Sequence, residues 1–70
     1  MYRYLVVEYC WEDDSYYASR HILGSYETIG EARKAAGKYI KENVKKKRIK
    51  YRDWRVDVHS ELVFFPIRDV

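Results

Sequence analysis

The side chains in this sequence that could do catalytic chemistry are few and widely spaced. Cys10 and His21 are the residue types of a nucleophile and its base, but no activating motif surrounds either of them. A lone cysteine on a strand is typical of a small core residue. His21, His59 and Cys10 are too scattered to predict a metal site. The acids Glu12–Asp14 fit a solvated turn. The sequence therefore predicts a protein that is not an enzyme and that needs no metal or cofactor.

A basic segment, residues 45–55, mixes seven Lys or Arg with two aromatic rings. Cations that contact phosphates beside rings that stack on bases are the working parts of nucleotide and single-strand sites. The alternative interpretation is a solvated helix end followed by a loop. The candidate ligand-binding residues in this segment are Arg48, Tyr51, Arg52 and Trp54.

A second aromatic and basic cluster follows the acidic turn. If residues 16–23 form a strand, alternation places Tyr16 with Arg20 on one face and Tyr17 with His21 on the other. A ring beside a guanidinium or imidazole can hold a purine and its phosphate. The alternative is a set of ordinary strand residues on a half-exposed sheet. We add Tyr16, Tyr17, Arg20 and His21 to the candidate ligand-binding residues.

One helix is expected at about residues 28–47. Thr28 stands three residues before Glu31, which is the spacing of a capping box. Apolar residues then recur at three- and four-residue steps, as on one helix face: Ile29, Ala32, Ala36, Tyr39, Ile40 and Val44. Gly37 stands in the middle of the helix at a cost of about 1 kcal/mol against alanine. Together with Ala36 it predicts that the sheet, or another subunit, approaches the helix closely there.

Strand patterns flank this helix. Residues 2–11 and 16–23 alternate around the turn Glu12–Ser15, and both faces of residues 2–11 are apolar enough for a central strand. Residues 54–67 form either one long strand, with or without a bulge, or two short ones, and Pro66 limits them. The prediction is an α+β fold in ββαβ order, with a three- or four-stranded antiparallel sheet covered by one helix.

Length and composition narrow the class of protein further. The 70 residues make a single domain, 1–70, too small to bury a large core without help, so we expect a homo-oligomer. The apolar segment 63–67 is either core or a subunit interface. No apolar run approaches the roughly 20 residues that span a bilayer. With one cysteine and no secretory signal, the chain is expected to be cytoplasmic and away from membranes.

Charge and aromatic content indicate a binding surface. The chain carries a net charge of +3, yet Arg33–Arg55 alone holds eleven Lys or Arg against two acids. The first fifteen residues hold four acids and one arginine, so the molecule has an acidic end and a basic end. Eight of its residues are tyrosine, which suits recognition because a flat apolar ring carries a polar tip.

The segment His21-Ile22-Leu23-Gly24-Ser25-Tyr26-Glu27-Thr28-Ile29-Gly30-Glu31-Ala32, followed by a lysine-rich helix and a long strand, resembles small ββαβ domains encoded by phages. In these domains a hairpin ends in Gly-x-Tyr or Gly-x-Phe, and a Ser/Thr cap with Glu-Ala opens the helix. The resemblance implies an α+β fold and a role in host takeover or counter-defence. One such class consists of oligomeric proteins that sequester the nucleotide signals of bacterial immunity.

Three binding functions follow from these features. The first is a phage-type counter-defence protein in the host cytoplasm that sequesters a small anionic, nucleotide-like ligand as an oligomer. The second is an inhibitor that docks on a host protein. The third is a nucleic-acid-binding protein that uses the basic stretch 45–55.

Overall fold

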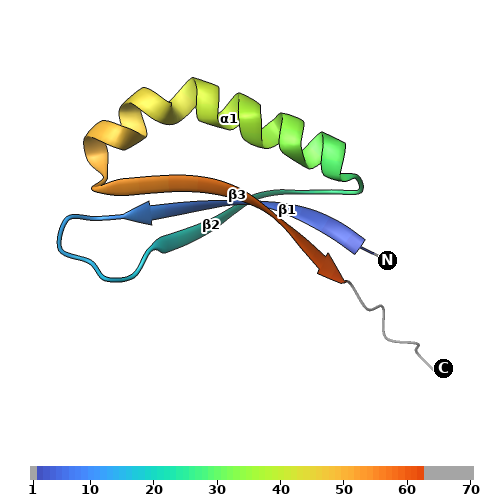
Figure 1. Ribbon diagram of the computed structural model, residues 1–70, viewed down its shortest axis with the longest axis horizontal. Helices are drawn as coiled ribbons and strands as arrows, with labels where there is room; N and C mark the ends of the chain where they lie inside the picture. The colour runs from blue at the N-terminus through green and yellow to red at the C-terminus, as the bar shows by residue number, and fades with distance from the viewer. Residues whose placement is uncertain (1, 63–70) are drawn as a thin grey trace.

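The computed structural model describes residues 2–62, which form two layers (Figure 1). The elements follow in the order β1 (Tyr2–Trp11), β2 (Ser19–Tyr26), α1 (Ile29–Lys50) and β3 (Asp53–Leu62). The strands make one antiparallel sheet in the order β2-β1-β3, and α1 lies across one side of it. The predicted α+β fold in ββαβ order is therefore confirmed, with three strands in the described chain and β1 at their centre.

Alternation along β1 separates the two faces of the sheet. Val6 packs with Ala32 and Ala36 of α1 into the core, whose partly buried members include Val56 and Val58 of β3. The even-numbered residues of β1 thus face the helix. The odd-numbered ones lie on the opposite face, which α1 does not cover and which is called the open face below. Cys10, on the helix side, is buried as predicted.

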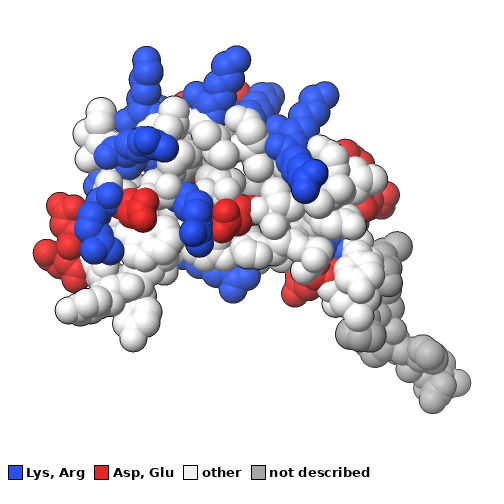
Figure 2. Space-filling model, viewed as in Figure 1, with Lys and Arg blue, Asp and Glu red and all other residues white. Residues whose placement is uncertain are grey.

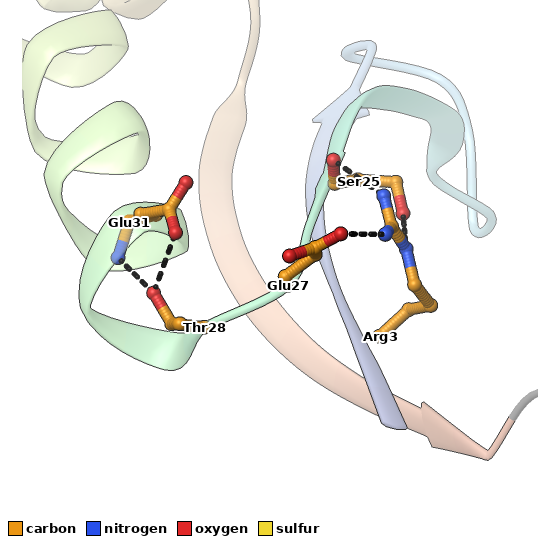
Figure 3. A network of polar contacts seen from close by, with 5 residues as sticks. All are labelled: Arg3, Ser25, Glu27, Thr28 and Glu31. Atoms are coloured by element: carbon orange, nitrogen blue, oxygen red, sulfur yellow. Dashed lines mark hydrogen bonds and ion pairs between the residues drawn. The ribbon is translucent and has the colours of Figure 1, made fainter. Parts of the chain in front are cut away.

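The start of α1 is fixed by its cap (Figure 3). The Thr28 backbone is extended, and its hydroxyl oxygen accepts the Glu31 amide at 3.2 Å. The same hydroxyl donates to the Glu31 carboxylate at 3.0 Å, so the carboxylate bonds the cap side chain instead of the cap amide. Beside the cap, Arg3 of β1 donates to Ser25 and lies 3.8 Å from the carboxylate of Glu27, which ties the β2–α1 connection to the sheet.

Two details of the predicted helix need correction. It continues three residues past Lys47, to Lys50, and ends where the Tyr51 amide donates to the Lys47 carbonyl at 2.9 Å. The close approach expected at Ala36 and Gly37 holds only for Ala36, which is buried. At Gly37 no other part of the described chain approaches the helix, because a Cβ built there meets nothing within 4 Å, and a contact with another subunit stays a prediction.

The second strand lies three residues later than predicted. Tyr16 and Tyr17 belong to the β1–β2 loop, residues 12–18, because Ser15 forms local hydrogen bonds with the backbone of Tyr17 in both directions, at 2.7 and 3.2 Å. At the other end, Gly24 does not end the strand. The register shifts there, leaving Leu23 between the paired residues Ile22 and Gly24, and pairing then continues to Tyr26.

β3 pairs with β1 in unbroken register from Asp53 to Leu62, which confirms a single strand over this range. The predicted continuation to residue 67, with its apolar segment 63–67, lies outside the described residues. In the described part of the chain, no helix is long and apolar enough to cross a membrane.

Candidate functional site

Two segments far apart in sequence meet at one end of the molecule. The β1–β2 loop and the turn between α1 and β3 lie together where β1 ends (Figure 1). Arg52 joins them: its amide donates to the Trp11 carbonyl at 2.9 Å, and its guanidinium donates to the Ser15 carbonyl at 3.1 Å. These bonds fix the position of a cation that belongs to neither a helix nor a strand.

Arg52 lies between two shallow hollows. The first, about 320 Å³ in volume, is lined by Asp13, Asp14, Ser15, Tyr16 and Arg52. The second, about 300 Å³, is lined by Arg48, Tyr51, Arg52, Asp53 and Trp54. Both volumes are at the lower end of the range for ligand pockets. Five of the eight predicted site residues, Arg52 among them, therefore line the two hollows, and they come from both predicted clusters.

The rings of Tyr16 and Tyr51 at this end differ in exposure and in the contacts they make. Tyr16 is 94% exposed, and its side chain is available to a ligand. The Tyr51 ring already has two cations near it, with the Nζ atoms of Lys47 and Lys50 at 5.7 and 5.4 Å from the ring centroid. The face of the Tyr51 ring is therefore engaged with lysine side chains, and Tyr16 is the ring on which a base can stack.

The structure does not bring the other predicted residues to the hollows. Tyr17 is exposed in the loop but lines neither hollow. Arg20 and His21 lie on β2, paired with Tyr9 and Glu8 of β1. They therefore point to opposite faces of the sheet, Arg20 to the open face and His21 to the side of α1. Since Tyr16 and Tyr17 are not on a strand, the predicted pairing of Tyr16 with Arg20 and of Tyr17 with His21 is wrong.

Trp54 lines the second hollow with little exposed surface. Only 9% of it is exposed, and its indole Nε1 donates to the carboxylate of Glu8 at 2.9 Å. The same oxygen of Glu8 accepts the Tyr39 hydroxyl at 2.7 Å and lies 3.3 Å from the Lys47 ammonium. Glu8 is 4% exposed, so β1, β3 and α1 meet at one buried carboxylate, whose Oε2 has three partners.

The pKa values in this group show how the charge is held. Burial by itself raises the pKa of Glu8, but hydrogen bonds from Trp54, Tyr39 and Lys47 together bring it below its ordinary value of 4.5. Burial lowers the pKa of Lys47, but the bond and charge of Glu8 outweigh this and raise it above 10.5. The pair is thus ionised at neutral pH. Burial also raises the pKa of the Cys10 thiol, which keeps it protonated and weakly nucleophilic.

Sequence reasoning did not single out the Glu8 group. The available signal was a lone acid between Val6 and Cys10, on the face of β1 that had to meet the helix. A charge at a core position implies a buried partner. The partners, Tyr39 and Lys47, are eight residues apart on α1, which places them on the same side of the helix.

The open face carries a second group that sequence reasoning passed over. The rings of Tyr9 and Trp11 stack with centroids 6.1 Å apart, and the guanidinium of Arg55 lies 5.7 and 5.8 Å from them. The Tyr9 hydroxyl is 2.8 Å from Nε2 of His59. On the open face, the pair Val7–Asp57 lies between the position of Tyr9 and that of His59, and Val7 is completely buried. This group therefore covers Val7, and its cation is already engaged with the rings.

Comparison with protein-family models, curated proteins and solved structures gave no match, so the case for function depends on the residues described above. Within residues 2–62, no three His, Cys, Asp or Glu side chains are placed to share a metal ion. Within residues 2–62, the fold brings together around Arg52 a second cation for phosphates, Arg48, the exposed ring of Tyr16 and the carboxylates of the two hollows.

Proposed function

We propose that this protein is a non-enzymatic binding protein for a small, phosphate-bearing, nucleotide-like ligand, held at the two hollows around Arg52. The observation that carries the proposal is the position of Arg52 between a hollow with a free tyrosine ring and a hollow with a second arginine. A nucleotide needs both kinds of contact, a few ångströms apart.

The two hollows divide the ligand by chemistry. Arg48 and Arg52 hold the phosphate groups, since guanidinium groups bond phosphate oxygens in pairs. Tyr16 stacks on the base. Asp13 and Asp14 accept hydrogen bonds from ribose hydroxyls or an exocyclic amine. A phosphate group next to these two carboxylates would be repelled by their charge. The second hollow has one carboxylate, Asp53, which already accepts the Trp54 amide at 2.8 Å. The phosphates therefore lie on the side of Arg48, and the nucleoside lies on the side of Tyr16.

In its full form, the proposal is a phage-type counter-defence protein that acts as an oligomer in the host cytoplasm and sequesters a nucleotide signal. The support for this part is the resemblance of residues 21–32 and the following helix to small phage domains. Sequestration needs tight binding and no turnover, which fits a site of exposed cations and rings.

The test is isothermal titration with a panel of mononucleotides, cyclic mono- and dinucleotides, and inorganic phosphate. We expect micromolar or tighter binding of at least one nucleotide, and a loss of tenfold or more in Arg48→Ala and in Tyr16→Ala. The matched controls are Arg33→Ala and Tyr17→Ala, which remove an exposed residue of the same type that lines neither hollow.

Native mass spectrometry of the protein purified from a bacterium with active nucleotide-signalling defences extends this test. Nucleotide-sized adducts on a defined oligomer support sequestration. The proposal fails if no nucleotide in the panel binds at millimolar concentration, or if Arg33→Ala and Tyr17→Ala weaken binding as much as their partners do.

A further inference from the structure

Five cations form a straight row along the outer side of α1. Lys34, Lys38, Lys41, Lys45 and Arg48 follow one another at steps of four, three, four and three residues, which keeps them on one helix face. All five are exposed. Fourteen residues separate the first from the last, so the row is about 21 Å long at 1.5 Å per residue. Figure 2 shows basic side chains standing out along the α1 side of the molecule.

The row lies opposite the buried side of the helix. Ala32 and Ala36 face the sheet, and a helix position half a turn away from them faces solvent. Lys47 is different: it faces inward and pairs with Glu8. The same helix thus turns Lys47 inward and keeps the five cations of the row exposed to solvent.

The charge on α1 is strongly unbalanced. It contains nine Lys or Arg and two Glu, a formal charge of +7, whereas the whole chain carries +3, so the remainder carries −4. Within residues 2–62, none of the five row cations is in an ion pair. Of the two acids, Glu31 is bonded to the Thr28 cap, and Glu42 is exposed beside the row. Successive cations three and four residues apart repel each other, which disfavours the helix unless an anion lies along it.

We propose that this row binds the phosphodiester backbone of a nucleic-acid duplex, without sequence preference. A duplex fits because it is a straight polyanion with a phosphate every 3.4 Å along each strand, so a row of this length passes about six phosphates of one strand. No member of the row is aromatic, so the row offers no surface on which unpaired bases could stack. Contacts of this kind position a protein on nucleic acid and read no bases.

This surface is separate from the nucleotide site. It runs along the length of α1, and only Arg48, at its last position, also lines a hollow. The closing experiment therefore leaves Arg48 and the β1–β2 loop unchanged, so that the two proposals succeed or fail independently.

The experiment is fluorescence anisotropy with a labelled 20-base-pair DNA duplex of mixed sequence, at salt concentrations from 50 to 200 mM. Five phosphate contacts predict a slope of log Kobs against log salt of about −4.5, which weakens binding about 500-fold across this range. In Lys38→Gln/Lys41→Gln we expect the slope to become shallower by about 2, with at least tenfold weaker binding at 100 mM salt.

The matched control is Arg33→Gln/Lys46→Gln, which removes the same charge from exposed positions of α1 outside the row. Glutamine is a good helix former, so both variants should fold, and circular dichroism checks this. Duplex binding that the row variant weakens and the control variant preserves supports the proposal. It is overturned if the protein does not bind the duplex at 50 mM salt, if both variants lose binding equally, or if a single strand of the same length binds more tightly than the duplex.

Discussion

Replacing Glu8 with glutamine tests whether the buried carboxylate holds α1 against the sheet. Hydrogen bonds to a charged group contribute about 1.5–3 kcal/mol each. In Glu8→Gln the amide oxygen still accepts hydrogen bonds from Trp54 and Tyr39, but the charged contact with Lys47 is lost. A neutral amide also costs less to bury than a carboxylate. The net loss should therefore be close to that of one charged bond, about 2 kcal/mol at pH 7. In a domain of this size, such a loss lowers Tm by about 8–16 °C.

The pH dependence of this loss has a definite sign. The pKa of Glu8 is lower in the folded state than its ordinary value of 4.5, so the folded state binds the proton more weakly than the unfolded state. The stabilisation by the carboxylate is complete above pH of about 5, and it is lost as the pH falls through the folded pKa. The difference between the native protein and Glu8→Gln should thus be constant from pH 7 to about pH 5 and should shrink in more acidic solution.

Urea denaturation followed by tryptophan fluorescence measures both effects, because buried Trp54 contacts Glu8 directly. The control is Asp57→Asn, which makes the equivalent change in a carboxylate that is paired with Arg55 at 3.0 Å and is 34% exposed. An exposed pair contributes at most about 1 kcal/mol. The carboxylate does not hold α1 against the sheet if the free energy of unfolding of Glu8→Gln lies within about 0.5 kcal/mol of that of the native protein at pH 7, or if the difference persists unchanged at pH 3.

Two further substitutions test the helix itself by the same urea measurement. Gly37→Ala should raise the free energy of unfolding by about 1 kcal/mol, since the residue is in the interior of α1, no described glycine has a positive φ, and a Cβ at Gly37 meets nothing within 4 Å. A loss of stability would contradict the open space found around Gly37. Thr28→Ala should lower the free energy of unfolding by about 1 kcal/mol through loss of the cap, whereas Thr28→Ser should retain most of it. Equal losses in the alanine and serine variants would contradict the capping role.

The order and type of the helix and strands could be predicted from the sequence because capping and alternation are strong local signals. Thr28 and Glu31 marked the helix start because cap spacing is short-range, and the structure has the cap at that residue. The alternation of β1 placed it at the centre, because apolar residues on both faces need cover on both sides. The boundaries of β2 were missed because Ser15 forms hydrogen bonds with Tyr17 that compete with strand pairing, and because the shift near Gly24 depends on β1.

The candidate site was harder to predict than the fold. Sequence proximity suggested two separate clusters, one near Tyr16 and one near Arg52, and only the tertiary fold brings these two residues to the same hollow. Trp54 was selected as a stacking ring because it stands among cations in the sequence. Its parity on β3 turns it toward Glu8. Periodicity identifies which residues share a face, but the depth of each residue depends on which element covers that face.

The distribution of cations on α1 links its stability to its proposed partners. The five cations of the row make four successive like-charge pairs, each costing about 0.2–0.5 kcal/mol, or roughly 1–2 kcal/mol in all. Against this, α1 fully buries only Ala32 and Ala36, and it depends on the Thr28 cap and on Lys47 with Glu8 for further stabilisation. A polyanion along the row would neutralise this repulsion. A ligand at 100 times its Kd stabilises the folded state by about 2.7 kcal/mol, somewhat more than the loss of about 2 kcal/mol expected for Glu8→Gln. The outer cations therefore make α1 a helix whose stability rises when an anion binds, while its inner face keeps the fold together without one.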